Sequence, residues 1–222
     1  MDKEFVITED GSHTIYLPEM DEHYHSTHGA IQESLHIYIN QGLFQVTKQE
    51  ISILEIGFGT GLNAYLTFAF ADHKKLTINY FSIEKYPLSE IDYLKLNYPS
   101  KIFPEYSDVF EKIHRAKWDS IVKISPEFSL QKVSADLLTF EFNCLPQFDL
   151  VYYDAFAPGK QPEMWTDEII QKVASTVKKD GILITYCAKG SVRRAFSAAG
   201  FQMERIPGPI GKKEILRGKK SI

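Results

Sequence analysis

The chain has 222 residues, of which 44% are hydrophobic and 24% are charged, and its formal net charge at pH 7 is −4. This composition is typical of one globular domain that buries a full core without disulfide bonds. The best apolar run, residues 64–71, is far shorter than the roughly 18 residues of a membrane span, so we expect no membrane-spanning helix. Because the start of the chain also lacks the features of a secretion signal, we expect a cytoplasmic protein.

The beginning of the chain predicts a small extension. Residues His13–Leu17 are typical of a short strand, and Gly29–Asn40 has the pattern of a helix closed by Gly42. We therefore expect residues 1–45 to form a hairpin-and-helix extension packed on a core domain of residues 46–222.

Residues that commonly bind metals are sparse. Glu22–His28 contains three histidines, but no cysteine or second cluster completes a ligand set, so we expect no metal site. The segment is more simply interpreted as surface histidines or as a loop over the active site. Cys144 and Cys187 lie in different apolar segments without metal-type spacing, which predicts buried free thiols.

From residue 51 onward, strands alternate with helices. The expected strands span 51–56, 78–83, 148–153, 182–186, 201–206 and 213–216, and the expected helices span 61–71, 88–97, 167–178 and 191–199. Two further strand-like runs between Ser120 and Asp136 are broken at Ser125-Pro126, which predicts a hairpin or a strand with an inserted turn. The alternation predicts an α/β fold with a mainly parallel sheet covered on both faces. In such sheets the ligand binds at the carboxyl ends of the strands.

The first of these carboxyl ends carries the motif Glu-Ile-Gly-Phe-Gly-Thr-Gly, residues 55–61. Three glycines between a strand and a helix let backbone approach a ligand, although a plain tight turn has the same pattern. Glu84, at the end of the next strand, is placed to bind both hydroxyls of a ribose. The spacing lacks the third glycine of a dinucleotide-binding motif, where this chain has Leu62. Glu55 instead favours a cationic or amino-bearing ligand such as S-adenosylmethionine.

Two aspartates end later strands. Asp136 is placed to meet an adenine amino group, and the alternative is that it caps a short helix at residues 137–140. Asp154 would lie beside the methyl group of the cofactor, where it and the carbonyls of residues 155–157 can orient an amine and accept a proton. Pro158 and Pro162 would stiffen this loop, and Phe156 or Trp165 could stack on a planar base. In the alternative, Asp154 caps a turn and the aromatic residues simply pack.

The end of the chain is basic. From Lys189 onward there are nine lysines and arginines against two glutamates, whereas the preceding part is acidic. Such a segment is either a solvated tail or a surface that meets phosphates, and charge alone does not decide between them.

These motifs together resemble the MnmC-type tRNA methyltransferases. The resemblance covers almost the whole chain and is carried by residues 55–63, 84–88, 154–166, 192–194 and 199–201. Its most specific part is the proline-rich loop that ends in Pro162-Glu-Met-Trp165. The stretches Asp10-Gly-Ser12 and Tyr24-His-Ser26 also resemble single-domain members of this family.

The resemblance implies a class I S-adenosylmethionine-dependent methyltransferase with a Rossmann-like fold and a mainly parallel, seven-stranded sheet. It implies methylation of 5-aminomethyl-2-thiouridine at the tRNA wobble position to the 5-methylaminomethyl form. Many relatives carry a flavin-dependent oxidase after this domain. Because this sequence stops at Ile222, we expect a separate oxidase to supply the amine wherever the host makes the carboxymethyl form.

The resemblance and the residue patterns define three sets of expected site residues. The cofactor-binding residues are Glu55, Gly57, Gly59, Thr60, Gly61, Asn63, Glu84, Lys85, Asp136 and Asp154. The catalytic residues are Asp154, Phe156 and Pro158. The residues expected to bind tRNA are Lys160, Trp165, Lys189, Arg193, Arg194, Lys212 and Lys213. The overall acidity of the chain favours a local contact with phosphates.

Two other functions fit the same fold. The first is a transferase that methylates or aminopropylates a small amine, which would need an acidic pocket and no basic tail. The second is a cofactor-binding module without catalysis. Lys160, Arg193 and Arg194 near the active edge favour an anionic substrate over a polyamine.

Overall fold

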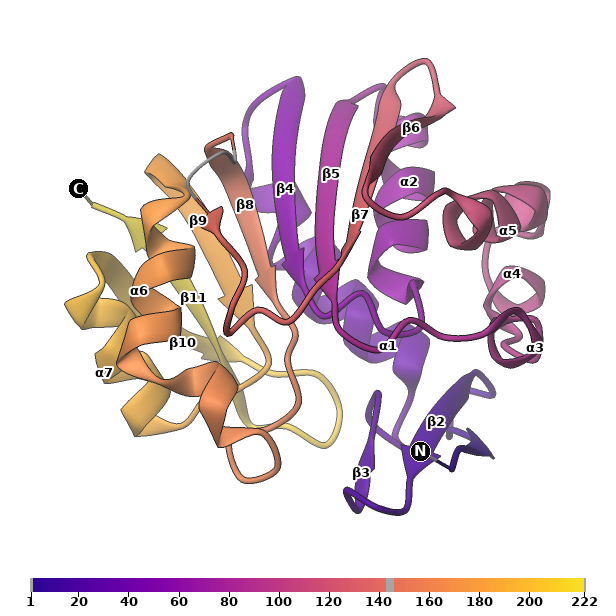
Figure 1. The fold of residues 1–222 in the computed structure, drawn as a ribbon, viewed down its shortest axis with the longest axis horizontal. Helices are drawn as coiled ribbons and strands as arrows, with labels where there is room; N and C mark the ends of the chain where they lie inside the picture. Colours follow the sequence, from indigo (N-terminus) through magenta and orange to yellow (C-terminus); the bar gives the residue numbers. More distant parts are fainter. Residues whose placement is uncertain (1, 143–145, 222) are drawn as a thin grey trace.

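A computed structural model describes residues 2–142 and 146–221 of the chain. An eight-stranded sheet forms its centre (Figure 1). Five neighbouring strands are parallel, in the spatial order β9 (Val177–Thr185), β8 (Phe148–Tyr153), β4 (Glu50–Ile56), β5 (Thr77–Glu84) and β7 (Phe128–Ser134). Every residue of β8 is buried, as expected for a central strand covered on both faces.

Antiparallel strands complete both edges of the sheet. Beyond β9 lie β11 (Glu214–Lys220) and then β10 (Phe201–Pro207), and β6 (Ser120–Ser125) pairs with β7 at the other edge. The mainly parallel sheet is confirmed, but it has eight strands where seven were expected. The extra strand is β6, which forms the hairpin predicted from the break at Ser125-Pro126, because proline stops the first strand from continuing.

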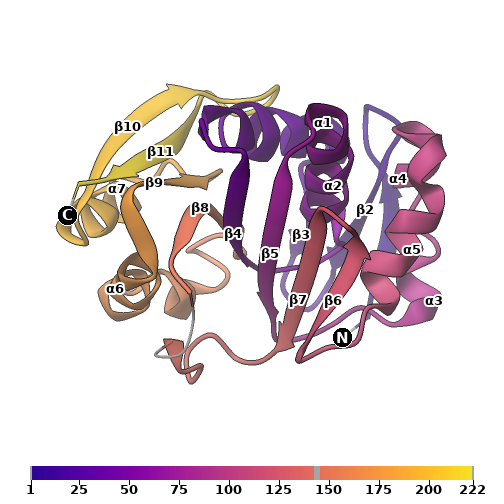
Figure 2. The same ribbon diagram turned by 90° about the horizontal axis from the view of Figure 1, so that it is seen from above.

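Helices cover the two faces of the sheet (Figure 2). Ile51 and Ile53 of β4 pack in one buried cluster with α2 (Leu62–Lys74), whereas Leu54 and Ile56 pack with α6 (Asp167–Ser175) and α7 (Gly190–Ala198). This division follows from the alternation of side chains along a strand. Shorter helices lie between β5 and β6, namely α3 (Glu90–Tyr93), α4 (Tyr98–Lys101) and α5 (Ser107–Arg115).

Several element ends differ from the prediction. The expected helix at 88–97 is limited to α3, after which the chain turns into α4, and α5 was not predicted. Helix α6 ends at Ser175 rather than at Lys178, because the chain enters β9 at Val177. Cys187 is a buried free thiol, whereas Cys144 lies outside the described residues. In the described ranges no helix is long and apolar enough to cross a membrane.

The N-terminal part forms a separate sheet of three strands, β1 (Glu4–Ile7), β2 (His13–Leu17) and β3 (Glu22–His23), which lies near one end of the central strands (Figure 1). Helix α1 (Ala30–Ser34) follows and continues as one stretch of π-helix, η1 (Leu35–Asn40). Ile15, Ile37 and Ile39 are fully buried in the same cluster as α2. The division of the chain at residue 45 stays a prediction.

The order of the strands creates a crevice beside β4. The chain continues from β4 to β5 on one side and later returns to β8 on the other side. The order of the strands thus reverses between β4 and β8, and α/β sheets bind their ligands at the carboxyl edge of such a switch point.

A buried carboxylate holds three chain segments together at the opposite, amino-terminal edge. Asp149 is 3% exposed and accepts hydrogen bonds from Lys48, from Lys178 Nζ at 2.8 Å and from the backbone N–H of Ser52 at 2.9 Å. These partners belong to the segment before β4, to β9 and to β4 itself. Because the acid is paired on both oxygens, its burial does not leave an isolated charge.

We expect Asp149→Ala to lower the free energy of unfolding by about 2 to 4 kcal/mol, because two lysines and one backbone N–H lose their acceptor. Denaturation by urea measures this change. Glu168→Ala is the matched control, since it removes an exposed ion pair with Lys172 and should cost no more than about 0.5 kcal/mol. Equal losses in the two variants would contradict this role of Asp149.

Candidate functional site

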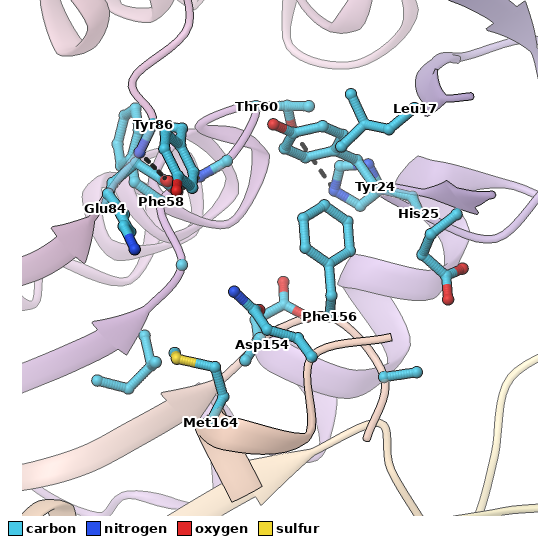
Figure 3. Close-up of a pocket in the computed structure, with 18 of the residues that line it drawn as sticks. Leu17, Tyr24, His25, Phe58, Thr60, Glu84, Tyr86, Asp154, Phe156 and Met164 are labelled. Atoms are coloured by element: carbon cyan, nitrogen blue, oxygen red, sulfur yellow. Dashed lines mark hydrogen bonds between the residues drawn. The ribbon is translucent and has the colours of Figure 1, made fainter. Parts of the chain in front are cut away.

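A cavity of about 740 Å³ opens at the carboxyl edge of the central sheet. Its wall comes from the loops after β4, β5, β7 and β8 and from the N-terminal segment around Tyr24. Figure 3 shows Asp154 and Phe156 between Glu84 on one side and Tyr24 and His25 on the other. Six acidic side chains and three lysines line the cavity among the described residues, and each of these lysines is paired with an acid.

The glycine loop and the loop that carries Asp154 touch each other. Gly57 has a φ of 89°, and a Cβ at this position would lie 2.8 Å from the carbonyl oxygen of Asp154. The loops are also tied to the sheet, because the N–H of Gly57 donates to Ile83 and the N–H of Asp154 donates to Ile56. A side chain at Gly57 would force the loops apart. The cavity lining includes Gly57, Gly59, Thr60 and Asn63, whereas Gly61 is the N-cap of α2.

The backbone holds Glu84 at the end of β5. Its two carboxylate oxygens accept hydrogen bonds from the N–H groups of Gly59 at 3.0 Å and Tyr86 at 2.7 Å. Each oxygen keeps a lone pair for a ligand. The carboxylate therefore links the glycine loop to β5 and remains part of the cavity wall.

Asp136 and Lys85, both expected to bind the cofactor, form an ion pair of 2.7 Å at the edge of the cavity. Asp136 also accepts a hydrogen bond from the N–H of Leu138 at 3.0 Å. The pairing with Lys85 and this hydrogen bond lower the pKa of Asp136. Asp136 thus both lines the cavity and caps the segment that follows it. That segment is a turn and not the expected helix.

Asp154 is held by two side-chain donors. The hydroxyl of Tyr38 donates to its Oδ1 at 2.5 Å, and Asn63 Nδ2 donates to its Oδ2 at 2.9 Å. Burial raises the pKa of the Asp154 carboxyl to about 7, although both hydrogen bonds oppose this change. Near neutral pH this side chain can therefore exchange a proton, which an ordinary exposed aspartate cannot do.

The rest of the loop after β8 is fixed by its aromatic residues. Phe156 lines the cavity and meets the ring of Tyr24 edge to face at 5.1 Å. Trp165 is 8% exposed, packs on Tyr153, and donates from Nε1 to the carbonyl of Phe156 at 2.8 Å. The indole is thus part of the core that shapes the loop, and the structure does not place it in the described cavity lining. Pro158 also lies outside that lining.

The carbonyl groups of residues 155–157 were expected to face an amine. Each of them already accepts a hydrogen bond from the chain: Ala155 from the hydroxyl of Tyr186, Phe156 from Trp165, and Ala157 from backbone N–H groups. The side chain of Asp154 is a further acceptor of this loop: it lines the cavity, and each of its oxygens keeps a lone pair for a ligand.

Glu55 is fully buried and stands outside the described cavity lining. Ser82 Oγ donates to its Oε2 at 2.8 Å, while Oε1 has no partner among the described residues. Burial raises the pKa of Glu55 well above its usual range, and the hydrogen bond from Ser82 links β4 to β5 inside the sheet.

The cavity residues from the N-terminal segment were not predicted individually; they include Tyr24, His25, Glu33 and Tyr38. Burial lowers the pKa of His25 to about 4, which makes the ring neutral, and its Nδ1 has no partner in the described part of the chain. Of the two interpretations of the histidine-rich segment, surface histidines or a loop over the active site, the position of His25 in the cavity lining favours the second. No group of three potential metal ligands occurs within residues 2–142 and 146–221.

The predicted tRNA-binding residues divide into two groups. In the first group, the ammonium of Lys212 lies over the ring of Tyr186 and forms an ion pair with Glu33 at 3.3 Å in the cavity wall. Lys160 of the same group forms an ion pair with Asp21 at 3.1 Å. The other cations are exposed and make no ion pair with any described residue; they are Lys189, Arg193, Arg194 and Lys213. A Cβ on Gly159 would lie 3.9 Å from Lys189 Nζ, which places this lysine beside the loop after β8.

Comparison with known proteins gives consistent results. The model of a family described as S-adenosyl-L-methionine-dependent methyltransferase matches residues 101–221, which is more than half of the chain. The bifunctional protein MnmC for tRNA 5-methylaminomethyl-2-thiouridine biosynthesis is 32% identical in Pseudomonas syringae pv. syringae and 30% identical in Vibrio vulnificus. These matches cover 88% and 90% of this chain, which spans only 31% and 33% of the length of the two relatives.

Solved structures show the same fold. The crystal structure of MnmC2 from Aquifex aeolicus has a TM-score of 0.77 at 26% identity, covering 99% of this chain and 70% of that one. Spermidine synthase from Thermotoga maritima has a TM-score of 0.58 at 13% identity over 100% of this chain and 72% of that one, which shows a shared fold alone. The resemblance to the MnmC-type methyltransferases is confirmed. The chain belongs to the S-adenosyl-L-methionine-dependent methyltransferases, and S-adenosyl-L-methionine is its cofactor.

Proposed function

We propose that this protein methylates the aminomethyl group of 5-aminomethyl-2-thiouridine at the wobble position of tRNA. The relatives support this substrate, because they are named for the biosynthesis of 5-methylaminomethyl-2-thiouridine in tRNA. One observation carries the proposal: in an acidic cavity beside the glycine loop, Asp154 presents a carboxylate whose pKa is raised to about 7. An amine that enters this cavity meets an acceptor able to orient it and to take its proton.

The charge of the cavity suits S-adenosyl-L-methionine. Its surplus of acidic side chains favours a cationic ligand, and the glycine loop lines it through Gly57 and Gly59. The buried Oδ1 of Asn63 has no partner among the described residues and can accept from an amino group. Glu84 and Asp136 would hold the ribose and the adenine, as expected from their positions. When bound, the cofactor supplies a methyl group on a positively charged sulfur.

Asp154 would prepare the substrate for transfer. An alkylamine is mostly protonated near neutral pH, so its nitrogen must lose one proton before its electron pair is free. The Asp154 carboxylate would accept that proton while Tyr38 and Asn63 keep the side chain in place. Phe156 lines the cavity in edge contact with Tyr24, and it would pack on the uracil ring.

The charges outside the cavity would bind the tRNA backbone. Lys189, Arg193 and Arg194 belong to the start of α7, and all three are exposed. Because they lack ion pairs with described residues, no acid has to be displaced before a phosphate binds. Lys212, by contrast, is engaged by Glu33, and we assign it to the cavity wall.

A small amine is the second candidate substrate, because an acidic cavity also suits a polycation. The exposed cations beside the cavity favour tRNA over this candidate. If tRNA is the substrate, the protein acts in the cytoplasm, and a separate oxidase or a further part of a longer protein provides the aminomethyl group. We also propose that residues 1–45 are an extension of the methyltransferase domain that completes its cavity through Tyr24.

Incubation of the protein and cofactor with tRNA that bears 5-aminomethyl-2-thiouridine should add one methyl group to that nucleoside, as measured by nucleoside mass spectrometry. Asp154→Ala should abolish the transfer, because the amine loses its acceptor, but should keep much of the affinity for the cofactor. A parallel reaction with spermidine tests the second candidate. If the wild-type protein adds no methyl group to this nucleoside, the proposed function is refuted. Full turnover by Asp154→Ala would refute the role of Asp154.

Glu84→Ala should weaken cofactor binding by about 1 to 3 kcal/mol, the usual contribution of hydrogen bonds to a charged group. Isothermal titration calorimetry measures the change. Glu84→Gln is the informative companion, because it keeps one acceptor oxygen and loses the charge. Glu168→Ala, on the exposed surface of α6, should bind like the wild type. Unaltered affinity in Glu84→Ala would remove this residue from the ribose site.

The double variant Arg193→Ala/Arg194→Ala should bind tRNA more weakly, with a salt dependence reduced by about 1 to 2 in the slope of log K against log salt concentration. Affinity for the cofactor should not change. Lys117→Ala/Lys123→Ala is a charge-matched control at the opposite edge of the sheet, around β6. An identical salt slope in both double variants would show that α7 does not contact phosphates.

A further inference from the structure

Tyr38 makes a contact that neither the motifs nor the comparisons single out. Its hydroxyl lies 2.5 Å from Asp154 Oδ1, although the two residues are 116 positions apart in the chain. The ring is 2% exposed and packs on the ring of Tyr152 at a centroid distance of 5.1 Å. Because the ring is enclosed by the core, the hydroxyl has little freedom to leave the carboxylate.

The backbone around Tyr38 has an unusual conformation that aims this side chain. The residue belongs to η1, the π-helix of residues 35–40, which follows directly on α1. Such wide turns are rare and are frequent at functional sites. Gly42 lets the helix end close to the sheet, since a Cβ there would lie 3.2 Å from side-chain atoms of Ile184 and of Tyr152.

We propose that Tyr38 is a positioning residue for methyl transfer: its hydroxyl holds the Asp154 carboxylate in the orientation that faces the cavity. This proposal rests on the proposed function, in which Asp154 receives the amine. In this arrangement Tyr38 acts through Asp154. The second donor, Asn63, holds the other oxygen and comes from α2 on the opposite side of the carboxylate.

The hydrogen bond from Tyr38 also stabilises the charged form of Asp154. Donation to a carboxylate favours ionisation, so loss of this donor makes the proton harder to remove. Burial and the nearby Glu33 act in the opposite direction, whereas Lys212 helps ionisation. Other charged or titratable groups also face Asp154 from the elements packed around it. They are Glu33 of α1, Lys212 before β11, Tyr186 directly after β9, Glu55 of β4 and Tyr80 of β5.

The test compares Tyr38→Phe with wild type in two measurements. The first is the titration of Asp154, followed by the carbon NMR signal of labelled aspartate that disappears in Asp154→Asn. Its midpoint should rise by about half a pH unit or more in Tyr38→Phe, because a donor to the charged form is lost. Incorporation of 3-fluorotyrosine at position 38, which makes the hydroxyl a stronger donor, should lower the midpoint.

The second measurement is the single-turnover rate of tRNA methylation. It should fall about tenfold or more in Tyr38→Phe, because a misplaced acceptor no longer orients the amine, while cofactor affinity stays within about twofold. Tyr152→Phe is the matched control. It removes an equally buried hydroxyl that contacts Thr67, so it should alter neither the midpoint nor the rate.

An unchanged midpoint in Tyr38→Phe would overturn the proposal, even if activity falls. A shifted midpoint with an unchanged rate would also overturn it, because Asp154 would then not need its partner for transfer. If the wild-type protein transfers no methyl group to tRNA, the proposed function fails, whereas the titration still decides whether Tyr38 controls Asp154.

Discussion

The structure depends on the close approach of two loops at the carboxyl edge of the sheet. The backbone of Gly57 lies against the carbonyl of Asp154, and hydrogen bonds tie each residue to the strand beside it. This contact requires a glycine, because its φ is positive and no space exists for a Cβ. It fixes the distance between the loop that would hold the cofactor and the carboxylate that would meet the substrate. The parallel strands β4 and β8 supply the rigid support for both.

Electrostatic selection follows from how the charges are divided. Inside the cavity, acids outnumber lysines and every lysine of the described lining is paired, so a ligand meets a negative surface. On α7, Arg193 and Arg194 are exposed without acid partners in the described part of the chain. A substrate whose cationic amine is attached to a polyanion suits both surfaces: the amine suits the acidic cavity, and the anionic groups suit the arginines of α7. The acidic net charge of the whole chain then limits contact to this one surface.

The α/β class and the main strands could be predicted from the sequence. So could the position of polar and glycine residues after β4, β5, β7 and β8, at the carboxyl edge of the sheet. These positions are local, because glycines and acids directly follow apolar runs whose period is visible in the chain. Contacts between distant segments were not predictable. Tyr38 and Asp154 meet only because α1 and η1 fold over the cavity, and a single tyrosine in an apolar helix carries no sign of this role. Trp165 was expected at the substrate, but its aromatic neighbours bury it instead. Pairing such as that of Lys212 with Glu33 likewise needs the folded chain.

The pairing of Lys212 with Glu33 has a consequence for how the protein is made. Glu33 is synthesised before the strands of the central sheet and Lys212 after β10, so the wall that they form cannot assemble before Lys212 has left the ribosome. Closing a contact between positions this far apart costs entropy that grows with the length of the loop. The cavity wall is therefore completed only when most of the sheet has been made, and loss of Lys212 would leave Glu33 without its ion-pair partner near Asp154.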